Sequence, residues 1–492
     1  EIRKNLIENN HIDAIIGLPA NIFFGTGIPT IIMVLRQKRE NTDVLIIDAS
    51  KGFIKEGKNN KLRASDIKRI ADTFIKRENI PKFSRVVSRE EIRSNDYNLN
   101  IPRYVDSSEA AEHWDVYASM FGGIPTAEID EMSEFWTAFP ALKKALFTES
   151  GIPYVNVSTP DIKSAIKSHP DVVGFEKAFN AAFSTFPAFL KEELIDRMGS
   201  IEISKAETVL SADIFERLKE IPLIDKYAAF QLLDDDWTGI SIDLEMLQTE
   251  GFAATKKVDP NLVIKKKDGK DQEVQEGWVG HIIPFDLVQA TLLSAETDEL
   301  HGLESRLAEI PSEYESILDE MTEEDKESCN DVLTEEGDAF VPKEVSKKIK
   351  ELKKDRSPES VALRTLLEKV ESLVKSEKEI KAEIKAKGAA LQAKTKDTIE
   401  SLSDEQALDL LEKKWIAPLI ESIHKLPDTV IDSLVSKIQA LQNKYATTFF
   451  EVEQQISETE ATLSGMIDDL EGNEYDMLGL NELKKLLGGS AE

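Results

Sequence analysis

The feature that most constrains this fold is a seven-residue apolar repeat in the last two fifths of its 492 residues. Apolar residues that alternate steps of three and four form one stripe on a helix, and such stripes make long helices pack together. Three seams show this spacing: Leu300, Leu303, Leu307, Ile310, Tyr314, Ile317 and Met321; then Leu363, Leu366, Val370, Leu373, Ile380, Ile384 and Leu391, with Glu377 and Lys387 at two positions of this seam; then Leu434, Ile438, Leu441, Tyr445, Thr448 and Val452, continuing after a skip through Ile456, Leu463, Met466 and Leu470. They predict three long helices folded back on one another, with one outer face open to a partner.

Local signals indicate where some of these helices begin and end. Ser357 before Pro358 places a capping hydroxyl ahead of a proline at the first helical position, and Ser403 with Gln406 matches a capping box. Pro311 is expected to end or kink the first long helix near Ile310, because it supplies no amide donor and its ring clashes with the preceding turn.

The first part of the chain has a different pattern. Short β-rich apolar runs at 12–18, 30–37 and 43–50 predict three buried strands. A stretch with helical spacing follows at 59–80, with Ser65 as a possible cap. An extended exit over 97–114 then leads into a polar connection.

Many short helical patterns occupy the middle of the chain, and we predict a helical domain there. Their apolar faces carry aromatic residues, which are typical of a helical core: Trp136, Phe139, Phe179 and Tyr227. Between 260 and 283, two strand-like halves flank Asp268 and Gly269, a dipeptide favoured in tight hairpin turns.

The charge balance restricts the partners of this chain. With 92 acidic against 61 basic residues the formal net charge is −31, so most of the surface should repel nucleic acid. Any DNA contact must be local or supplied by a partner. The single cysteine, Cys329, excludes intrachain disulfides and indicates a reducing cytoplasm. No apolar run approaches the roughly 20 residues of a membrane span, so no membrane contact is expected.

Self-sufficient catalytic motifs are not evident in the sequence. It contains no phosphate-binding P-loop, no dinucleotide fingerprint, no metalloprotease helix motif and no nucleophile elbow. Cys329 lies among acidic residues that disfavour a thiolate, so an inert cysteine is the better interpretation. Asp234, Asp235 and Asp236 could bind a divalent cation, but adjacent side chains diverge, and solvation of a helix end is favoured. Six histidines lack ligand spacing and are interpreted as structural or solvated: His11, His113, His169, His281, His301 and His424.

Several stretches together resemble one protein family. "LPANIFFGTGIPTIIMVLRQKR", "DVLIIDAS" and "NDYNLNIPRYV" resemble the end of the methyltransferase domain of the modification (M) subunits of type I DNA restriction-modification systems. "GGIPTAEIDEMSEFW" and "KYATTFFEVEQQISETEATL" resemble the tail of the family's longer members.

The resemblance implies a mostly α fold with a small α/β N-terminal part. We expect the last strands of a class I (Rossmann-like) methyltransferase sheet, then a helical domain, then a long antiparallel coiled-coil-like helical bundle. The corresponding domains are 1–106 for the methyltransferase part, 107–255 for the helical domain, 256–284 for a β-hairpin connection and 285–492 for an arm that docks the specificity subunit.

The family transfers a methyl group from S-adenosylmethionine to the N6 amino group of adenine in DNA, after the base has been flipped out. Aromatic faces offset part of the lost stacking. By resemblance, Phe23 or Phe24 is a candidate wall of the base pocket, with Gly25 and Gly27 allowing the backbone to turn. The alternative is that both phenylalanines pack at a strand end. Neighbours on a strand face opposite ways, so the choice between them stays open.

A basic loop, "FIKEGKNNKLR", interrupts the acidic background. Its four cations are candidates for DNA phosphate contacts: Lys55, Lys58, Lys61 and Arg63. Ordinary solvated loop charge is the alternative explanation.

Two family motifs are absent from the sequence. These are the glycine-rich cofactor loop and the Asn/Asp-Pro-Pro-aromatic tetrapeptide that holds the adenine amino group; Asp259-Pro260-Asn261-Leu262 is only a superficial echo in the wrong region. We therefore expect a C-terminal fragment that begins inside the methyltransferase domain. S-adenosylmethionine would serve the full-length protein, whereas the fragment should bind neither cofactor nor metal and should be inactive alone.

The resemblance also implies partners: DNA, the sequence-specificity (S) subunit, and, in the full complex, the restriction (R) subunit and a second modification subunit, in a prokaryotic cytoplasm. Two other functions remain open. One is a non-enzymatic acidic coiled-coil adaptor or DNA mimic, which the net charge favours. The other is an enzyme of an unrecognised class built on the helical middle.

Overall fold

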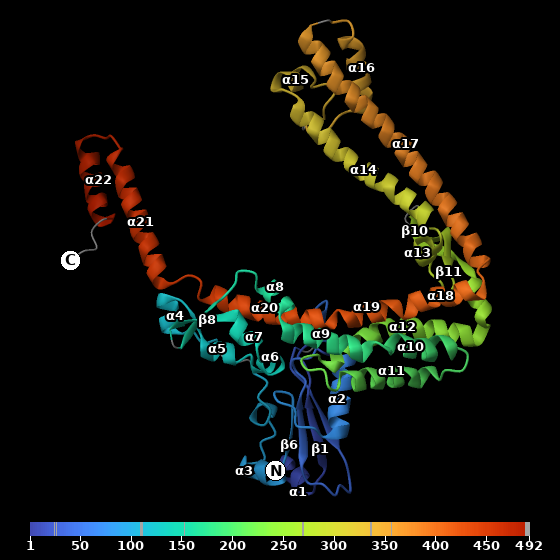
Figure 1. The fold of residues 1–492 in the computed structure, drawn as a ribbon, viewed down its shortest axis with the longest axis vertical. Helices are drawn as coiled ribbons and strands as arrows, with labels where there is room; N and C mark the ends of the chain where they lie inside the picture. The colour runs from blue at the N-terminus through green and yellow to red at the C-terminus, as the bar shows by residue number, and fades with distance from the viewer. Residues whose placement is uncertain are drawn as a thin grey trace. The chain divides into compact units, whose positions relative to one another are not determined.

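A computed structural model describes residues 1–23, 25, 27–108, 112–151, 153–267, 270–334, 337–355 and 357–487. The chain is mostly α-helical with small sheets, which confirms the predicted class at that level (Figure 1). It divides into two compact units. The first comprises Glu1–Phe189, Ser204–Thr238 and Leu419–Glu492, and the second comprises Leu190–Ile203 and Gly239–Pro418.

A four-stranded mixed sheet begins the first unit. The strand order is β2-β1-β3-β6, with β1 (Ile12–Gly17) parallel to β3 (Val44–Asp48). β2 (Ile31–Leu35) is antiparallel to β1, and β6 (Ser84–Val87) is antiparallel to β3. All residues of β1 and β3 are buried, as expected for central strands.

The strand predicted at 30–37 is exposed instead of buried. β2 is an edge strand that pairs only with β1 among the described strands, and four of its apolar residues are 37–59% exposed: Ile31, Ile32, Met33 and Leu35. The apolar run correctly predicted a strand. The run could not predict that, in the described part of the chain, one edge of this strand pairs with no other strand and most of its side chains stay exposed.

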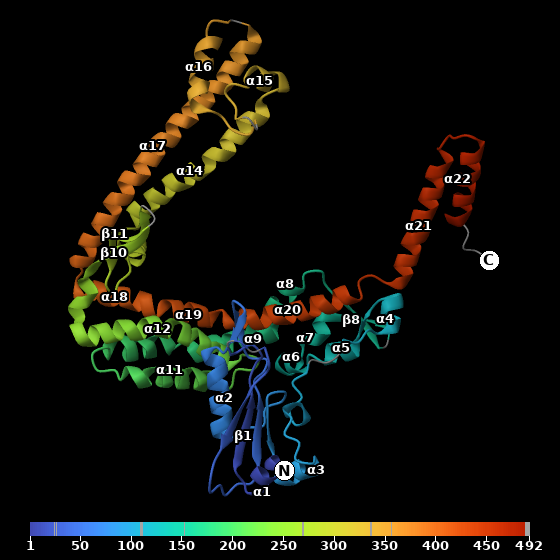
Figure 2. The same ribbon diagram turned by 180° about the vertical axis from the view of Figure 1, so that it is seen from behind.

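Helices cover both faces of the sheet (Figure 2). α2 (Ala64–Lys76) packs Ile70 and Phe74 on one face. α1 (Ile2–Glu8), α3 (Arg89–Ser94) and the short η1 (Ile101–Arg103) contribute Ile7, Ile92 and Ile101 to the other. A separate hairpin of β4 (Ile54–Glu56) and β5 (Asn59–Lys61) precedes α2.

Ser65 does not cap α2, contrary to the prediction. It lies inside the helix, is buried, and its amide donates to Gln231 Oε1 over 3.0 Å. The carboxylate of Asp66 instead accepts the amide of Arg63 over 3.0 Å, so the helix begins two residues earlier than a serine cap requires.

The rest of the first unit is a helical core. Phe139 and Phe179 are fully buried, Tyr227 is nearly so and Trp136 is half-buried, as predicted for these aromatics. The elements are α4 (Val116–Phe121), β7 (Ile124–Pro125), α5 (Thr126–Asp130), α6 (Ser133–Ala138), α7 (Leu142–Leu146), β8 (Phe147–Gly151), β9 (Tyr154–Val157), α8 (Ile162–Ser168), α9 (Pro170–Phe183), α11 (Ile203–Leu218), α20 (Leu426–Lys444), α21 (Phe449–Asp468) and α22 (Glu474–Leu487), with α10 (Phe186–Leu190), α12 (Lys226–Glu250) and α19 (Ala417–His424) crossing the division.

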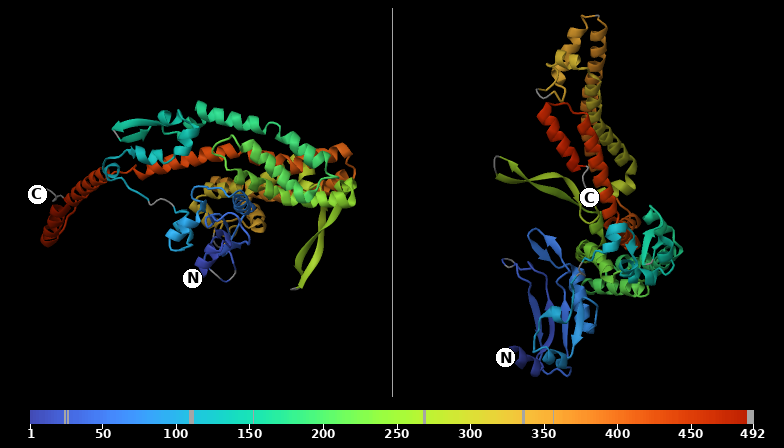
Figure 3. Two further views of the ribbon diagram at one scale, coloured as in Figure 1. Left: turned by 90° about the horizontal axis from the view of Figure 1, so that it is seen from below. Right: turned by 90° about the vertical axis from the view of Figure 1, so that its left-hand side faces the viewer.

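The second unit contains two of the long helices. α14 (Ser294–Glu320) and α17 (Pro358–Glu400) run side by side, and residues of both seams meet in a buried cluster with α16 (Pro342–Leu352). Figure 3 shows β10 (Val258–Lys267) and β11 (Lys270–Gly280) as a two-stranded ribbon; the predicted turn residues Asp268 and Gly269 lie outside the described residues. The other elements are η2 (Lys191–Asp196), η3 (Phe252–Lys256), α13 (Phe285–Leu292), α15 (Glu323–Ser328) and α18 (Asp404–Trp415).

The predicted caps are confirmed, whereas the predicted end of the helix near Pro311 is not observed. Ser357 accepts the amide of Ser360 over 3.3 Å, and Ser403 with Gln406 forms the capping box. α14 continues through Pro311, with Ile310 and Ile317 buried on either side of it. Tertiary burial on both sides stabilises the helix against the lost hydrogen bond, because most helix stability in proteins comes from packing.

The third seam is divided between two helices of the first unit, whereas the other two seams lie in the second unit. α20 ends at Lys444, and Thr448 begins α21 through a capping box with Glu451. Within the first unit, α20 packs Ile431, Leu434 and Ile438 into a core built with residues 124–175, while the apolar residues of α21 stay largely exposed. Heptad spacing therefore identified apolar stripes correctly but not what covers them.

Two composition-based expectations concern the chain as a whole. Cys329 is fully buried, and burial raises the pKa of its thiol, as expected for an unreactive cysteine. None of the helices in the described ranges combines the length and apolarity needed to cross a membrane.

Candidate functional site

The candidate site lies at the carboxyl ends of β1 and β3. In sheets with parallel strands, ligands bind where the loops leave these ends. The loop 18–30 follows β1 and is closed at its base, where the amide of Leu18 donates to the carbonyl of Thr30 over 2.8 Å. Ile22 anchors it by packing on the same sheet face as Ala14 and Ile16.

Phe23 is the described member of the predicted aromatic pair. It sits in a bend of this loop with 54% of its surface exposed, so it does not pack at a strand end. Phe24 lies outside the described residues. Gly25 has φ of +82°, a left-handed conformation that favours glycine. At Gly27 an added Cβ would lie 3.2 Å from Asn21 Oδ1, so a side chain there would press on the loop.

The structure ties the aromatic loop to the predicted basic loop. Asn60, in β5, donates its amide to the carbonyl of Asn21 over 2.9 Å and its side-chain Nδ2 to the carbonyl of Ala20 over 2.8 Å. These two bonds fix the β4–β5 hairpin against the loop that carries Phe23. Two groups of candidates that are about 30 residues apart in sequence thus share one edge of the sheet.

The four predicted cations of this hairpin differ in their surroundings. Lys61 lies 3.2 Å from Glu56, and Arg63 forms two hydrogen bonds to Asp66, which raise the pKa of its guanidinium. Lys55 and Lys58 are exposed, and the described part of the chain offers neither of them an ion pair. The two lysines are therefore the cations most available to an external anion.

Sequence reasoning missed Asp48, at the end of β3. It is 7% exposed and lies opposite Gly17 in the sheet register. Its carboxylate accepts the amide of Ser50 over 3.0 Å and the hydroxyl of Ser107. The sequence signal that could have identified Asp48 is its place as an acidic residue at the end of an otherwise apolar run. Both oxygens are engaged, so Asp48 fixes the edge of the site.

Two glycines at this edge are closely covered by side chains of the protein. A nucleotide cradle needs glycines that a ligand can approach. An added Cβ at Gly17 would lie 2.7 Å from Ile101 Cδ1, and one at Gly52 would lie 2.8 Å from Asp66 Oδ1. Side chains of the protein already occupy the space at both glycines.

Two other groups of titratable side chains in the described ranges are held by hydrogen bonds. Gln231 donates to Asp234 and Asp235 over 3.2 and 2.8 Å, and burial raises the pKa of Asp234. His281 bonds Asp259 over 2.6 Å and Glu250 over 3.1 Å, which raises the pKa of the imidazole. Within the described ranges, no three His, Cys, Asp or Glu side chains could share a metal ion.

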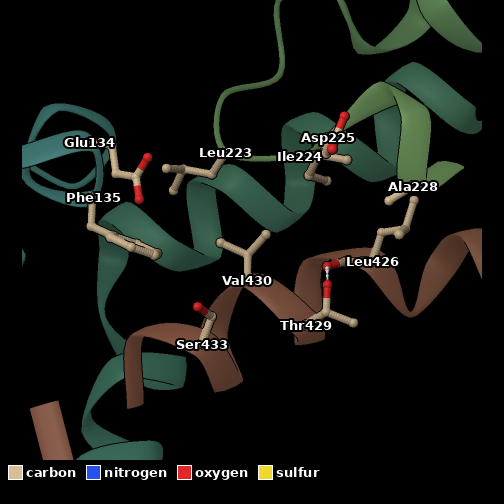
Figure 4. A pocket seen from close by; sticks show the side chains of 10 residues that line it. All are labelled: Glu134, Phe135, Leu223, Ile224, Asp225, Ala228, Leu426, Thr429, Val430 and Ser433. Carbon is tan, nitrogen blue, oxygen red and sulfur yellow. Dashed lines mark hydrogen bonds between the residues drawn. The ribbon is translucent and has the colours of Figure 1, made fainter. Parts of the chain in front are cut away.

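A cavity of about 260 Å³ lies in the helical part of the first unit (Figure 4). Its wall includes Phe135 and Val430 of the helical core. Its carboxylates are already near cations, since Lys437 lies 3.5 Å from Glu134 and Arg69 lies 3.8 Å from Asp225. The cavity is a packing feature of the core without a free reactive group. Its lining is Glu134, Phe135, Leu223, Ile224, Asp225, Ala228, Leu426, Thr429, Val430 and Ser433.

The part of the chain that contains this edge is similar to known proteins. Residues 1–113 match the family described as N-6 DNA Methylase. The methylase subunit of the type I restriction enzyme MpnII of Mycoplasma pneumoniae is 39% identical over 116 residues, 23% of this chain and 21% of that protein. The MjaVII methylase subunit of Methanocaldococcus jannaschii is 39% identical over 122 residues, 24% of this chain and 21% of that protein.

A crystal structure of a type I restriction-modification methyltransferase subunit from Streptococcus thermophilus is 52% identical over 22% of this chain and 23% of that chain, with a TM-score of 0.22. The chain thus matches about a fifth of the length of the methylase subunits to which it is similar. Residues 1–113 of this chain therefore match the N-6 DNA Methylase family model, and they are similar to the methylase subunits of type I restriction enzymes.

Proposed function

We propose that this chain is the C-terminal part of a type I modification subunit, whose complete form methylates the N6 amino group of adenine in DNA. In this proposal the loop 18–30 provides one wall of the pocket for the flipped base. The observation that carries the proposal is the exposed Phe23 at the carboxyl edge of the sheet, bonded through Asn60 to a hairpin with two unpaired lysines.

Exposure of β2 supports a larger sheet. An exposed apolar edge strand is normally covered or paired, because its free backbone groups and side chains otherwise promote aggregation. We infer that β1, β2 and β3 are the last strands of a methyltransferase sheet and that β2 pairs with a further strand. The cofactor loop and the Asn/Asp-Pro-Pro-aromatic motif would come from the part that supplies it.

The base-wall role is tested by Phe23→Ala in the complete methyltransferase, with 2-aminopurine at the target adenine. Loss of a stacking face worth about 1–3 kcal/mol should lower kcat/KM by roughly 10- to 100-fold and weaken the flipping signal. Phe24→Ala is measured in parallel. Ile75→Ala, a 76% exposed residue on α2, is the control. Normal methylation and flipping by both phenylalanine variants would contradict the proposal.

The phosphate role is tested by Lys55→Ala with Lys58→Ala. Each phosphate contact contributes about −0.9 to the slope of log K against log salt, so the double variant should flatten that slope by about 2. Lys61→Ala should change it less because of Glu56. Lys177→Ala, exposed on α9, serves as the control. An unchanged slope would leave the hairpin as ordinary solvated charge.

The cofactor proposal concerns this chain by itself. We propose that S-adenosylmethionine serves the complete enzyme and that these 492 residues neither bind it nor methylate DNA. The reason is that neighbouring side chains occupy the space beside Gly17 and Gly52. Titration calorimetry of S-adenosylmethionine into this chain should show no saturable heat. A saturable isotherm would contradict the assignment.

The proposed partners are DNA and the specificity subunit, with the restriction subunit and a second modification subunit in the full complex of a prokaryotic cytoplasm. We propose that α21 and α22 dock the specificity subunit. A deletion testing this should begin at residue 449, since α20 belongs to the core and its loss would unfold the first unit. The deletion should abolish co-purification, and retained binding would refute the docking role.

A second candidate function is an acidic adaptor or DNA mimic. The observation that favours it is the uneven charge, because residues 1–113 hold 19 basic and 16 acidic side chains whereas the remainder holds 42 and 76. This chain should then compete with DNA for a basic groove on a partner. Competition that is unaffected by Phe23→Ala and by the lysine substitutions would move this candidate to first place.

A further inference from the structure

Five aromatic side chains gather on the surface where α4 meets the start of α21. Trp114, Tyr117, Phe121, Phe449 and Phe450 are each 54–62% exposed, and we call them the aromatic corner. α4 contacts α21 within the first unit (Figure 1). The approach is close, since a Cβ added at Gly122 would lie 3.3 Å from Thr448 Cγ2.

Hydrogen bonds hold the backbone beneath this corner. Tyr445 is the centre: its hydroxyl accepts the amide of Asp115 over 3.1 Å and donates to Glu128. Lys444 bonds the same Glu128 over 2.8 Å and also the carbonyl of His113. These hydrogen bonds therefore fix the backbone on both sides of the aromatic corner in the absence of a partner.

The two helices of the corner also have fixed starts. Asp115 Oδ1 accepts the amide of Ala118 over 2.8 Å and so caps α4, and Thr448 with Glu451 caps α21. Large aromatic side chains on an ordered frame are typical of binding hot spots, because little conformational entropy is lost when they are covered.

An apolar seam continues from the corner along α21. Its residues follow steps of three and four, with Thr459 at one position, and are 39–62% exposed; we call them the open seam: Phe449, Val452, Ile456, Leu463, Met466 and Leu470. A contiguous exposed stripe of this kind on a capped helix marks an interaction surface.

The charge beside the open seam restricts its partner. Residues 449–487 contain ten acidic side chains and only two basic ones, Lys484 and Lys485. Two copies packed through this surface would bring like charges together, which disfavours a second copy of this chain as the occupant.

Another helix pair of this chain shows how acidic residues beside an apolar seam pair with basic residues of a neighbouring helix. α14 carries nine acidic residues and one arginine, and it packs on α17, which carries nine basic and eight acidic residues. Cross-helix pairs join Glu296 to Lys394, Glu299 to Lys387 and Glu320 to Lys369. A partner for α21 needs the same complementarity.

We propose that the aromatic corner and the open seam form one docking surface for a helical segment of another protein, whose apolar seam is flanked by Lys and Arg. The aromatic corner is the anchor of this contact. The inference rests on the proposed function, because the partner used to test it is the specificity subunit of the same restriction-modification system.

The anchor is tested by calorimetry of the specificity subunit with Trp114→Ala, Phe121→Ala and Phe450→Ala. All three side chains are exposed, so the melting temperature should stay within about 2 °C, while each substitution weakens binding at least 30-fold. Val209→Ala, 47% exposed on α11, is the matched control and should bind normally. Affinities within threefold of the parent for all three variants would overturn the anchor.

Charge reversal tests the chemistry of the partner. Glu453→Lys with Asp469→Lys places two cations beside the open seam and should weaken binding at least tenfold at low salt, with a smaller effect at high salt. Glu315→Lys, exposed on α14, is the control. Unchanged or tighter binding by the double variant would overturn a basic partner.

Two further results separate this inference from the docking role itself. If deletion of 449–487 leaves binding intact, the docking role fails. If the deletion abolishes binding and the corner variants bind normally, only the anchor fails. A dimer of this chain in sedimentation experiments that is lost on Phe450→Ala would identify a second copy as the occupant and overturn the proposal.

Discussion

Two helical hairpins in this chain carry the same apolar repeat and differ in what covers it. In α14–α17 the seam is closed, with Ile310, Ile317, Leu363 and Val370 buried. In α21–α22 every residue of the open seam is at least 39% exposed, and Ile467 is the only side chain that the structure describes as buried in either helix.

The charges of the two hairpins explain the difference. Basic residues of α17 face acidic residues of α14, so the closed hairpin supplies its own complement. Between α21 and α22 the described cross-helix ion pair is Lys484 with Asp468, and the remaining acidic side chains have no such complement. A heptad repeat thus predicts that a stripe exists, while the charges beside it indicate whether this chain or another protein covers it.

The largest difference between the hairpins should appear on truncating one leucine in each. Leu367→Ala empties a fully buried site in the closed hairpin and should lower the free energy of unfolding by about 2–5 kcal/mol. Leu463→Ala removes a 44% exposed side chain from the open seam and should change the melting temperature by less than about 2 °C. Equal losses in urea unfolding would show that α21 is covered within this chain.

Replacing the proline inside α14 should strengthen the closed hairpin. Pro311→Ala restores an amide donor in the helix interior and relieves a steric clash, whose cost is about 3 kcal/mol, so stability should rise by up to that amount. Thermal unfolding measures it. A loss of stability would mean that a bend at Pro311 is needed for packing on α17.

Removing the cap of α21 should have an intermediate effect on the open hairpin. Thr448→Ala deletes the hydroxyl that accepts the Glu451 amide over 3.1 Å and should cost about 1 kcal/mol. Binding of the specificity subunit should weaken as well, because the cap fixes the start of α21 beside α4. Thr459→Ala, whose hydroxyl bonds the Gln455 carbonyl inside the same helix, is the control. If both variants lose the same stability, the cap has no special role.

The smallest expected effect is a pH dependence confined to the closed hairpin. A hydrogen bond from Lys394 holds the pKa of Glu296 below its ordinary value of 4.5. The stabilisation is therefore present above that ordinary pKa and is lost as the pH falls through the lower pKa of the folded state. Glu296→Gln should flatten the acid limb of the stability profile, whereas Glu304→Gln should not. An unchanged acid limb in Glu296→Gln would show that this pair contributes nothing measurable.

Local signals in the sequence were sufficient for most elements. The runs at 12–18 and 43–50 became β1 and β3, and Ser357 and Ser403 cap helices where predicted, because such signals act between residues three or four apart. Ser65 failed as a cap because α2 already begins at Ala64, where Asp66 accepts the amide of Arg63, so that Ser65 lies inside the helix. The sequence identified the loop with Phe23 as a candidate site. It could not predict that Asn60 bonds this loop to the lysine hairpin.

The sequence by itself determined the apolar stripes, the helix starts, the acidic charge and the resemblance of its first part to DNA methylases. Only the tertiary structure decided that β2 stays exposed, that the third seam is divided at Thr448, and that α14 runs through Pro311. The physical reason is the range of the interactions. Periodicity and capping depend on neighbours along the chain, whereas the burial of a helix or strand depends on packing by residues that are distant in sequence. For the exposed apolar residues of β2 and α21, the described part of this chain supplies no such packing.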